Sequence, residues 1–260
     1  MKIAAYQFAV SGDIRRNFSA MQHAIHQAAT QDVRLLVFPE CALTGYPPRT
    51  IESSSAVDFS LTAALLDELG RMAMHYGMHI ITGTIIPEKE HCFNSAAVLC
   101  PDGQQLFYHK RALWGWDRDN FIPGNETGIF EIDGLKIGVR ICYEVRFPEY
   151  FRELYAAGTA LNLVLFHDVA DADSPERYEL IKAHLRTRAA ENVCPILSVN
   201  AIHPFQTAPT ALFDASGKIL CELERNAEGL LVYDFSPIPL DFSELGRKEI
   251  SDRIAQPLNI

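Results

Sequence analysis

Short apolar segments alternate with longer segments of helical periodicity in the first third of the chain. Phe18, Met21 and Ile25 follow one another at helical spacing, so they are expected on one face of a helix. Asp13 precedes them and is a residue type that caps helix N-termini. The alternation predicts two successive β–α units, in which helices pack on a sheet. The expected strands are residues 1–8, 33–38 and 78–85, and the expected helices are residues 14–31 and 57–76.

Tight-turn sequences replace helices in the middle of the chain. Pro101-Asp102-Gly103 separates two strand-like segments, and Asp133-Gly134 separates two more. Such turns join antiparallel strands, because proline presets one turn dihedral and glycine accepts a positive one. Two later turns, at 215–217 and 226–227, predict further hairpins, whereas the tail after Ser236 shows no clear period. The expected strands are 94–99, 105–109, 128–132, 135–141, 161–166, 195–199, 211–213, 218–222 and 230–235, and the expected helices are 148–157 and 175–192.

The number of hairpins favours one α/β architecture over another. A single doubly wound sheet is joined by helical crossovers, so it does not account for several antiparallel pairs. Two mixed sheets packed face to face, with helices outside, accommodate both kinds of connection. The chain shows no internal repeat, linker or break in composition. We therefore expect residues 1–260 to form one domain.

Charge and composition narrow the class of protein. Lys and Arg number 23 against 33 Asp and Glu, a formal charge of −10, which argues against binding to nucleic acid or to an anionic membrane surface. No apolar segment approaches the roughly 20 residues of a membrane helix, and the first residues do not resemble a secretory signal. A cytoplasmic location is expected. The six cysteines contain no close pair, so they are expected as reduced thiols, one of them available as a nucleophile.

Three chemically reactive residues stand at the ends of expected strands. Glu40, Lys110 and Cys142 each close an apolar segment, and reacting groups of α/β proteins gather at strand ends. Taken singly, a cysteine in an apolar strand usually packs, and a strand-end Glu or Lys is usually solvated. Together the three suit acyl transfer, because a base removes the thiol proton and a cation stabilises the oxyanion. The turn after Cys142 would aim the Tyr143 backbone N–H at that oxyanion.

The sequence around these residues resembles a known family. Phe38-Pro39-Glu40, the block at 108–113 (Tyr-His-Lys-Arg-Ala-Leu) and the block at 140–149 (Arg-Ile-Cys-Tyr-Glu-Val-Arg-Phe-Pro-Glu) are similar to the three signature blocks of the nitrilase, or carbon-nitrogen hydrolase, superfamily. Their order and approximate spacing match too. The resemblance covers essentially the whole chain. Further similar features are Gln7, Gly45-Tyr46, Pro123-Gly124 and residues 188–192.

The resemblance implies a fold, a reaction and an assembly. The fold is a four-layer α-β-β-α sandwich, commonly dimerised, and the tail at 236–260 would be associated with the dimer. Glu40 would act as general base and then acid, Lys110 would hold the oxyanion, and Cys142 would be acylated. The expected reaction is hydrolysis of a small, non-peptide amide without a cofactor, with a nitrile as the less favoured substrate. Acyl transfer to an amine, or a binding protein on the same fold, stays open.

The family's second acidic residue differs here. Its usual glutamate, six residues before Pro123, corresponds to Asp117. Aspartate is one methylene shorter, so Asp117 would reach Lys110 only if the loop lies further inward. Asp119 is the alternative partner, and a solvated loop acid is the alternative interpretation of Asp117.

Residues near the signature blocks are candidates for a substrate pocket. Tyr46, Trp114, Trp116 and His167 are the candidates, although tryptophans often pack and His167 could be a loop histidine with its own partners. Glu144 is expected to be structural and to pair with Arg146. The acids at 168, 171 and 173 beside His167 could suggest a metal or a cationic substrate, but such a loop is more often solvated, and no metal is expected.

Overall fold

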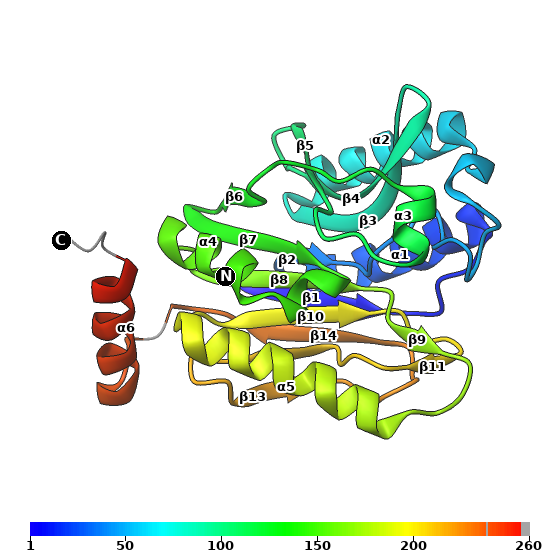
Figure 1. Ribbon diagram of the computed structural model, residues 1–260. Coiled ribbons are helices and arrows are strands. Elements are labelled where there is room, and N and C mark those ends of the chain that lie inside the picture. Colours follow the sequence, from blue (N-terminus) through cyan, green and yellow to red (C-terminus); the bar gives the residue numbers. More distant parts are fainter. Residues whose placement is uncertain (238, 256–260) are drawn as a thin grey trace.

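Two six-stranded sheets form the centre of the molecule, and helices cover their outer faces (Figure 1). The computed structural model describes residues 1–237 and 239–255. In spatial order, the first sheet contains β14 (Gly229–Asp234), β1 (Lys2–Gln7), β2 (Val33–Val37), β3 (His79–Glu88), β4 (His91–Leu99) and β5 (Gln105–His109). The second contains β13 (Ile219–Glu222), β12 (Ala211–Phe213), β10 (Ile196–Asn200), β8 (Leu161–Phe166), β7 (Leu135–Ile141) and β6 (Ile129–Ile132). A short ribbon pairs β9 (Val169–Ala170) with β11 (Phe205–Gln206).

Three apolar layers hold the four layers of the sandwich together. Successive strand residues point to opposite faces, so in β1 Ala4 packs under the helices of the first sheet and Ile3 faces the second sheet. Helices α1 (Ile14–Ala29) and α2 (Phe59–Tyr76) cover the first sheet, and α4 (Pro148–Ala157) and α5 (Pro175–Asn192) cover the second. Each fully buried aliphatic side chain contributes roughly 1.5–3 kcal/mol. The expectation of two mixed sheets with helices outside is confirmed.

Local sequence features, such as helix caps and prolines, predict most helix and strand boundaries to within a few residues of the observed ones. Asp13 caps α1 through its side chain, and α4 and α5 both begin at a proline, the favoured first helical residue. One hairpin was missed: β3 runs on to Glu88 and pairs antiparallel with β4 from His91. A short helix was missed as well, α3 (Trp116–Asn120).

The last expected hairpin is wrong. The strand at 230–235 does not pair with its predecessor β13, because β14 crosses to the other sheet and pairs antiparallel with β1. The Gln7 side chain binds the crossing segment by donating to the carbonyls of Glu224 (2.8 Å) and Ala227 (2.6 Å). A turn at 226–227 therefore marks a change of sheet.

A helix in the tail was also missed. Helix α6 (Phe242–Ala255) lies beside the body of the sandwich (Figure 1). It is held by polar contacts, such as Arg247 Nε donating to the Ala190 carbonyl at 3.1 Å. Phe242 and Ile254 are largely exposed, so the helix lacks the buried apolar face that sequence periodicity detects. Residues 238 and 256–260 of the predicted tail segment lie outside the described residues.

Candidate active site

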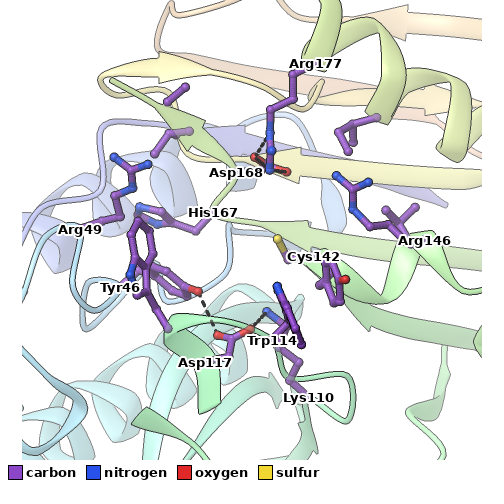
Figure 2. Close-up of a pocket in the computed structure, with 16 residues that line it drawn as sticks. Tyr46, Arg49, Lys110, Trp114, Asp117, Cys142, Arg146, His167, Asp168 and Arg177 are labelled. Carbon is purple, nitrogen blue, oxygen red and sulfur yellow. Dashed lines mark hydrogen bonds and ion pairs between the residues drawn. The ribbon is translucent and has the colours of Figure 1, made fainter. Parts of the chain in front are cut away.

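Strands from both sheets end at one cavity. Glu40 follows β2 and Lys110 follows β5, while Cys142 follows β7 and His167 follows β8. The last three line a cavity of about 420 Å³ (Figure 2). Tyr46, Trp114, Trp116, Asp117 and Tyr143 line the same cavity. The fold thus brings the candidates taken from distant parts of the chain to one place.

The Glu40 carboxylate is buried and fixed by three donors. Its Oε1 accepts from Lys110 Nζ at 2.8 Å and from Asn94 Nδ2 at 2.7 Å, and its Oε2 accepts from the His167 backbone N–H at 2.8 Å. The backbone position of Glu40 depends on Gly83. A Cβ at residue 83 would lie 2.2 Å from the Cys41 nitrogen and 2.5 Å from the Glu40 Cα. Only glycine lets β3 approach the end of β2 this closely.

Lys110 lies between two carboxylates. Its Nζ is 2.8 Å from Glu40 Oε1 and 2.8 Å from Asp117 Oδ2, and only 1% of its side chain is exposed. Burial acts to lower the pKa of Lys110, but the two carboxylates outweigh it and hold that pKa above its usual range. Lys110 therefore presents a permanent positive charge beside the cavity.

Asp117, rather than Asp119, occupies the place beside Lys110. Asp117 lies in the first turn of α3 and is buried, and its Oδ1 accepts from the Tyr46 hydroxyl at 2.9 Å. Asp119 is exposed. Asp117 reaches Lys110 despite its shorter side chain, because α3 places it beside the ammonium.

Cys142 lies at a sharp turn at the end of β7. Its φ is +47°, a left-handed conformation that is strained for a residue with a Cβ and typical of nucleophile turns. Tyr143 follows in the first turn of the 3₁₀ segment Cys142–Arg146, where N–H groups lack intrahelical acceptors. Burial, together with Glu40, Asp168 and Asp117, raises the pKa of the Cys142 thiol above its usual range, despite the opposing charge of Lys110. The resting sulfur is therefore a thiol that needs a base.

Glu144 fastens this turn to the neighbouring sheet. Its carboxylate is fully buried and accepts from the Tyr108 hydroxyl at 2.7 Å, the Arg111 N–H at 2.8 Å and the Ile141 N–H at 2.7 Å. The expected pairing with Arg146 is wrong, because these donors already occupy Glu144. Arg146 lines the cavity instead.

His167 packs beside the reacting groups. Its ring stacks on Tyr46 with centroids 5.1 Å apart, and neither ring nitrogen has a hydrogen-bond partner among the described residues. Burial lowers the pKa of His167 to about 4. The imidazole is therefore neutral at physiological pH.

The acids that follow His167 are each paired with an arginine. Asp168 binds Arg177 at 2.8 Å, Asp171 binds Arg49 at 2.5 Å, and Asp173 lies 2.7 Å from Arg225. The suggested preference of these acids for a cationic substrate finds no support in this arrangement. In residues 1–237 and 239–255, no group of three His, Cys, Asp or Glu side chains could hold a metal ion.

The two tryptophans stand at the rim of the cavity. Trp114 is 61% exposed and Trp116 is 47% exposed, and each ring lies under a guanidinium, Arg118 at 4.7 Å and Arg49 at 5.1 Å. They are wall residues that remain open to solvent.

Sequence reasoning missed four polar residues of this region. Arg49, Arg146 and Arg177 line the cavity, and Asn94 orients Glu40. Arg146 belongs to the block around Cys142, so its place in that block was a usable signal. Nothing in the local sequence of the other three marks them, because tertiary packing alone brings them to the site.

The fold and the site define a class. A two-sheet sandwich in which a half-buried cysteine shares a cavity with a lysine held by two carboxylates is built for nucleophilic chemistry on an acyl group. The model of the carbon-nitrogen hydrolase family matches residues 2–237, and the chain belongs to that family. It is an amidase-like member of the nitrilase superfamily.

Relatives and solved structures agree with this assignment. The chain is 30% identical over 203 residues to an (R)-stereoselective amidase from Pseudomonas sp., covering 78% of this chain and 71% of that protein. It is 28% identical over 239 residues to the 2-oxoglutaramate amidase of Bacillus subtilis, covering 88% of each. A variant of the amidase from Nesterenkonia sp. AN1, with the acetamide moiety of fluoroacetamide on its active-site cysteine, is 26% identical with a TM-score of 0.80, over 95% of each chain. None of the helices in the described ranges combines the length and apolarity needed to cross a membrane.

Proposed function

We propose that the protein hydrolyses small, non-peptide amides through a thioester on Cys142. The observation that carries this proposal is the Lys110 ammonium, fixed between Glu40 and Asp117 at the cavity that Cys142 lines. A cation so placed stabilises an oxyanion more strongly than it could in water. Glu40 is the base that the protonated Cys142 requires.

The reaction proceeds in two halves. Glu40 takes the thiol proton as the sulfur attacks the amide carbon, and Lys110 Nζ and the Tyr143 N–H hold the resulting oxyanion. When the C–N bond breaks, Glu40 gives its proton to the leaving nitrogen, and ammonia or an amine departs from a thioester. Glu40 then takes a proton from water, which attacks the thioester. The C–S bond breaks, the acid is released, and the proton returns to sulfur. A positioned carboxylate of this kind contributes about 10²- to 10⁴-fold.

Tyr46, Trp114, Trp116 and His167 form the walls that receive the acyl group. Asp117 acts through Lys110 as a positioning residue. Acyl transfer to an amine shares every step up to the thioester, so the two outcomes differ only in what attacks it. We propose that water is the attacking group, which gives hydrolysis.

The direct test is ammonia release from a panel of small amides, with intact-mass detection of the acyl-enzyme. Cys142→Ala should abolish both signals, and Cys221→Ala, which removes another half-buried thiol, should leave both. Turnover retained by Cys142→Ala would overturn the proposal. Product analysis with an added amine separates hydrolysis from acyl transfer.

We further propose that the protein forms a homodimer through α6. Phe242, Leu245, Ile250 and Ile254 are 94%, 55%, 48% and 77% exposed on this helix. Large exposed apolar groups gathered on one element are typical of an interaction surface.

A further inference from the structure

The protein fills most of the hydrogen-bonding sites of the Glu40 carboxylate. A carboxylate offers about four such sites, two on each oxygen. Lys110 Nζ and Asn94 Nδ2 occupy both sites of Oε1, and the His167 N–H occupies one site of Oε2. These are the donors that the described part of the chain supplies to Glu40. The site left open for a proton therefore lies on Oε2.

Asn94 contacts both the proposed base and the cation. Its side-chain amide donates to Glu40 at 2.7 Å, and its backbone carbonyl accepts from the Lys110 N–H at 2.8 Å. Asn94 lies on β4 and is completely buried. The amide has one donor end and one acceptor end, and half a turn would bring its oxygen to the carboxylate. The position of Glu40 therefore depends on what fixes the orientation of this amide.

The thiol of Cys41 faces the acceptor end of the same amide. Its Sγ lies 3.6 Å from Asn94 Oδ1, which is within hydrogen-bonding range for sulfur. Cys41 follows Glu40 directly and is completely buried, and its φ of +50° is a costly left-handed conformation for a residue with a Cβ. Burial, reinforced by the charge of Glu40, raises the pKa of the Cys41 thiol well above its usual range, despite Lys110. The sulfur thus keeps the proton with which it donates to the amide.

We infer that Cys41 is a positioning residue for the base, and that it acts by holding the NH₂ group of Asn94 toward Glu40. This inference rests on the proposed function. Without the thiol, the amide is free to turn its oxygen toward the carboxylate, and Oε1 loses a donor. The open site on Oε1 then competes with Oε2 for the Cys142 proton. Neither Cys41 nor Asn94 lines the cavity, so the effect falls on the chemical step rather than on substrate binding.

Serine and alanine at residue 41 separate the hydrogen bond from packing. Both substitutions remove the volume of the sulfur, but Cys41→Ser keeps a donor and Cys41→Ala does not. For amide hydrolysis, Cys41→Ala should lower kcat roughly 3- to 10-fold, the usual effect of one lost neutral hydrogen bond, with KM unchanged. Cys41→Ser should retain more than half of the wild-type kcat. Equal kcat values in the two variants would overturn the inference.

Cys92→Ala and Cys92→Ser are the matched controls. Cys92 is buried in the same apolar cluster as Cys41 and lies on β4, two residues before Asn94. Both variants should keep the wild-type kcat, because they leave the Cys41 thiol and the Asn94 amide in place. If Cys92→Ala costs as much as Cys41→Ala, the effect belongs to any cavity in this cluster, and the role of Cys41 is refuted.

A double-mutant cycle tests the route through Asn94. Asn94→Leu is close in size but removes the donor to a charged group, so it should lower kcat about 10- to 100-fold. Adding Cys41→Ala to Asn94→Leu should lower kcat no further, because residues that act through one contact are not additive. If the second substitution costs the same factor in both backgrounds, Cys41 does not act through Asn94.

Alkylation of Cys142 keeps this inference separate from the proposed function. Iodoacetamide reacts with the thiolate, so its rate reports proton transfer from Cys142 to Glu40 without hydrolysis of an amide. Mass analysis of the peptide that carries Cys142 should show slower alkylation in Cys41→Ala than in the wild type and Cys41→Ser. If no amide is hydrolysed but this difference is found, only the proposed function fails. If amides are hydrolysed and the three proteins are alkylated at one rate, only the inference fails.

Discussion

Lys110 has two carboxylate neighbours at the same distance but in different surroundings. Glu40 also contacts Asn94 and the His167 backbone, whereas Asp117 also contacts the Tyr46 hydroxyl. Glu40 is thus held by residues at the strand ends. Asp117 connects the Lys110 ammonium to the loop that carries Trp114 and Trp116. Removing one partner of a buried ion pair leaves the rest uncompensated, at a cost of about 3–5 kcal/mol.

Asp117→Asn should therefore lower kcat for amide hydrolysis by roughly 100-fold, because a misplaced Lys110 stabilises the oxyanion poorly. Asp117→Glu should retain more activity, since it keeps the charge, and Asp119→Asn should behave as the wild type because Asp119 is exposed. Steady-state kinetics of the three variants checks this. The role of Asp117 is refuted if Asp117→Asn and Asp119→Asn have equal kcat values.

The neutral state of His167 predicts a pH dependence of stability. Its pKa is near 6.5 in the unfolded chain and about 4 in the folded protein, because burial disfavours the charged ring. Between these values the unfolded chain binds more protons, so the contribution of His167 is complete above pH 6.5 and is lost as the pH falls towards 4. The loss should be about 2 kcal/mol between pH 7.5 and 5. Urea unfolding of the wild type and His167→Asn at both pH values isolates this contribution, and parallel pH profiles would contradict it.

At the scale of elements, the site is formed by residues that follow the ends of four strands. The strands β2, β5, β7 and β8 all deliver their carboxyl ends to the cavity. The approach of β3 to β2 at Gly83 is the tightest of these arrangements, because the Cβ of any other residue would meet backbone atoms of Pro39 and Cys41 at 2.3 and 2.2 Å.

Gly83→Ala should displace Glu40 and reduce amide hydrolysis at least tenfold, with a loss of about 1–3 kcal/mol in the free energy of unfolding from overpacking. Gly246→Ala is the control, because a Cβ there meets nothing within 4 Å, and alanine is the better helix former. Activity assays and denaturant unfolding of both variants test this. Wild-type activity in Gly83→Ala would contradict this prediction, because it would mean that the end of β2 can move without loss of amide hydrolysis.

Sequence patterns predicted elements where burial follows the local period. The bounds expected at 135–141, 148–157 and 175–192 agree with β7, α4 and α5. The patterns failed where a distant partner decides the structure, as for β14, which pairs with β1 rather than with its neighbour in the chain. They also failed for α6, whose apolar residues face solvent. The same division holds in the site: signature residues such as Cys142 could be predicted, but the contact of Asn94 with Glu40 emerges only once the fold is known.

At the scale of the whole molecule, the two sheets are joined at the site itself. The Glu40 N–H donates to the Phe166 carbonyl at 3.2 Å, and the His167 N–H donates back to Glu40 Oε2 at 2.8 Å. One sheet thus supplies the base and the ammonium, and the other supplies the nucleophile. The position of the base relative to the sulfur therefore depends on how the two sheets pack against each other.

The proposed homodimer through α6 can be tested directly. If the exposed apolar residues of α6 are buried between two copies, light scattering should give the mass of a dimer, twice 29.1 kDa. A charge placed at that interface would be buried without a partner, so the double variant Leu245→Glu/Ile254→Glu should shift the protein to monomer. Met74→Glu places one such charge on the exposed surface of α2 and should leave the dimer intact. A monomeric wild type would exclude the dimer, and a dimer that survives the double variant would move the interface to another face of the sandwich.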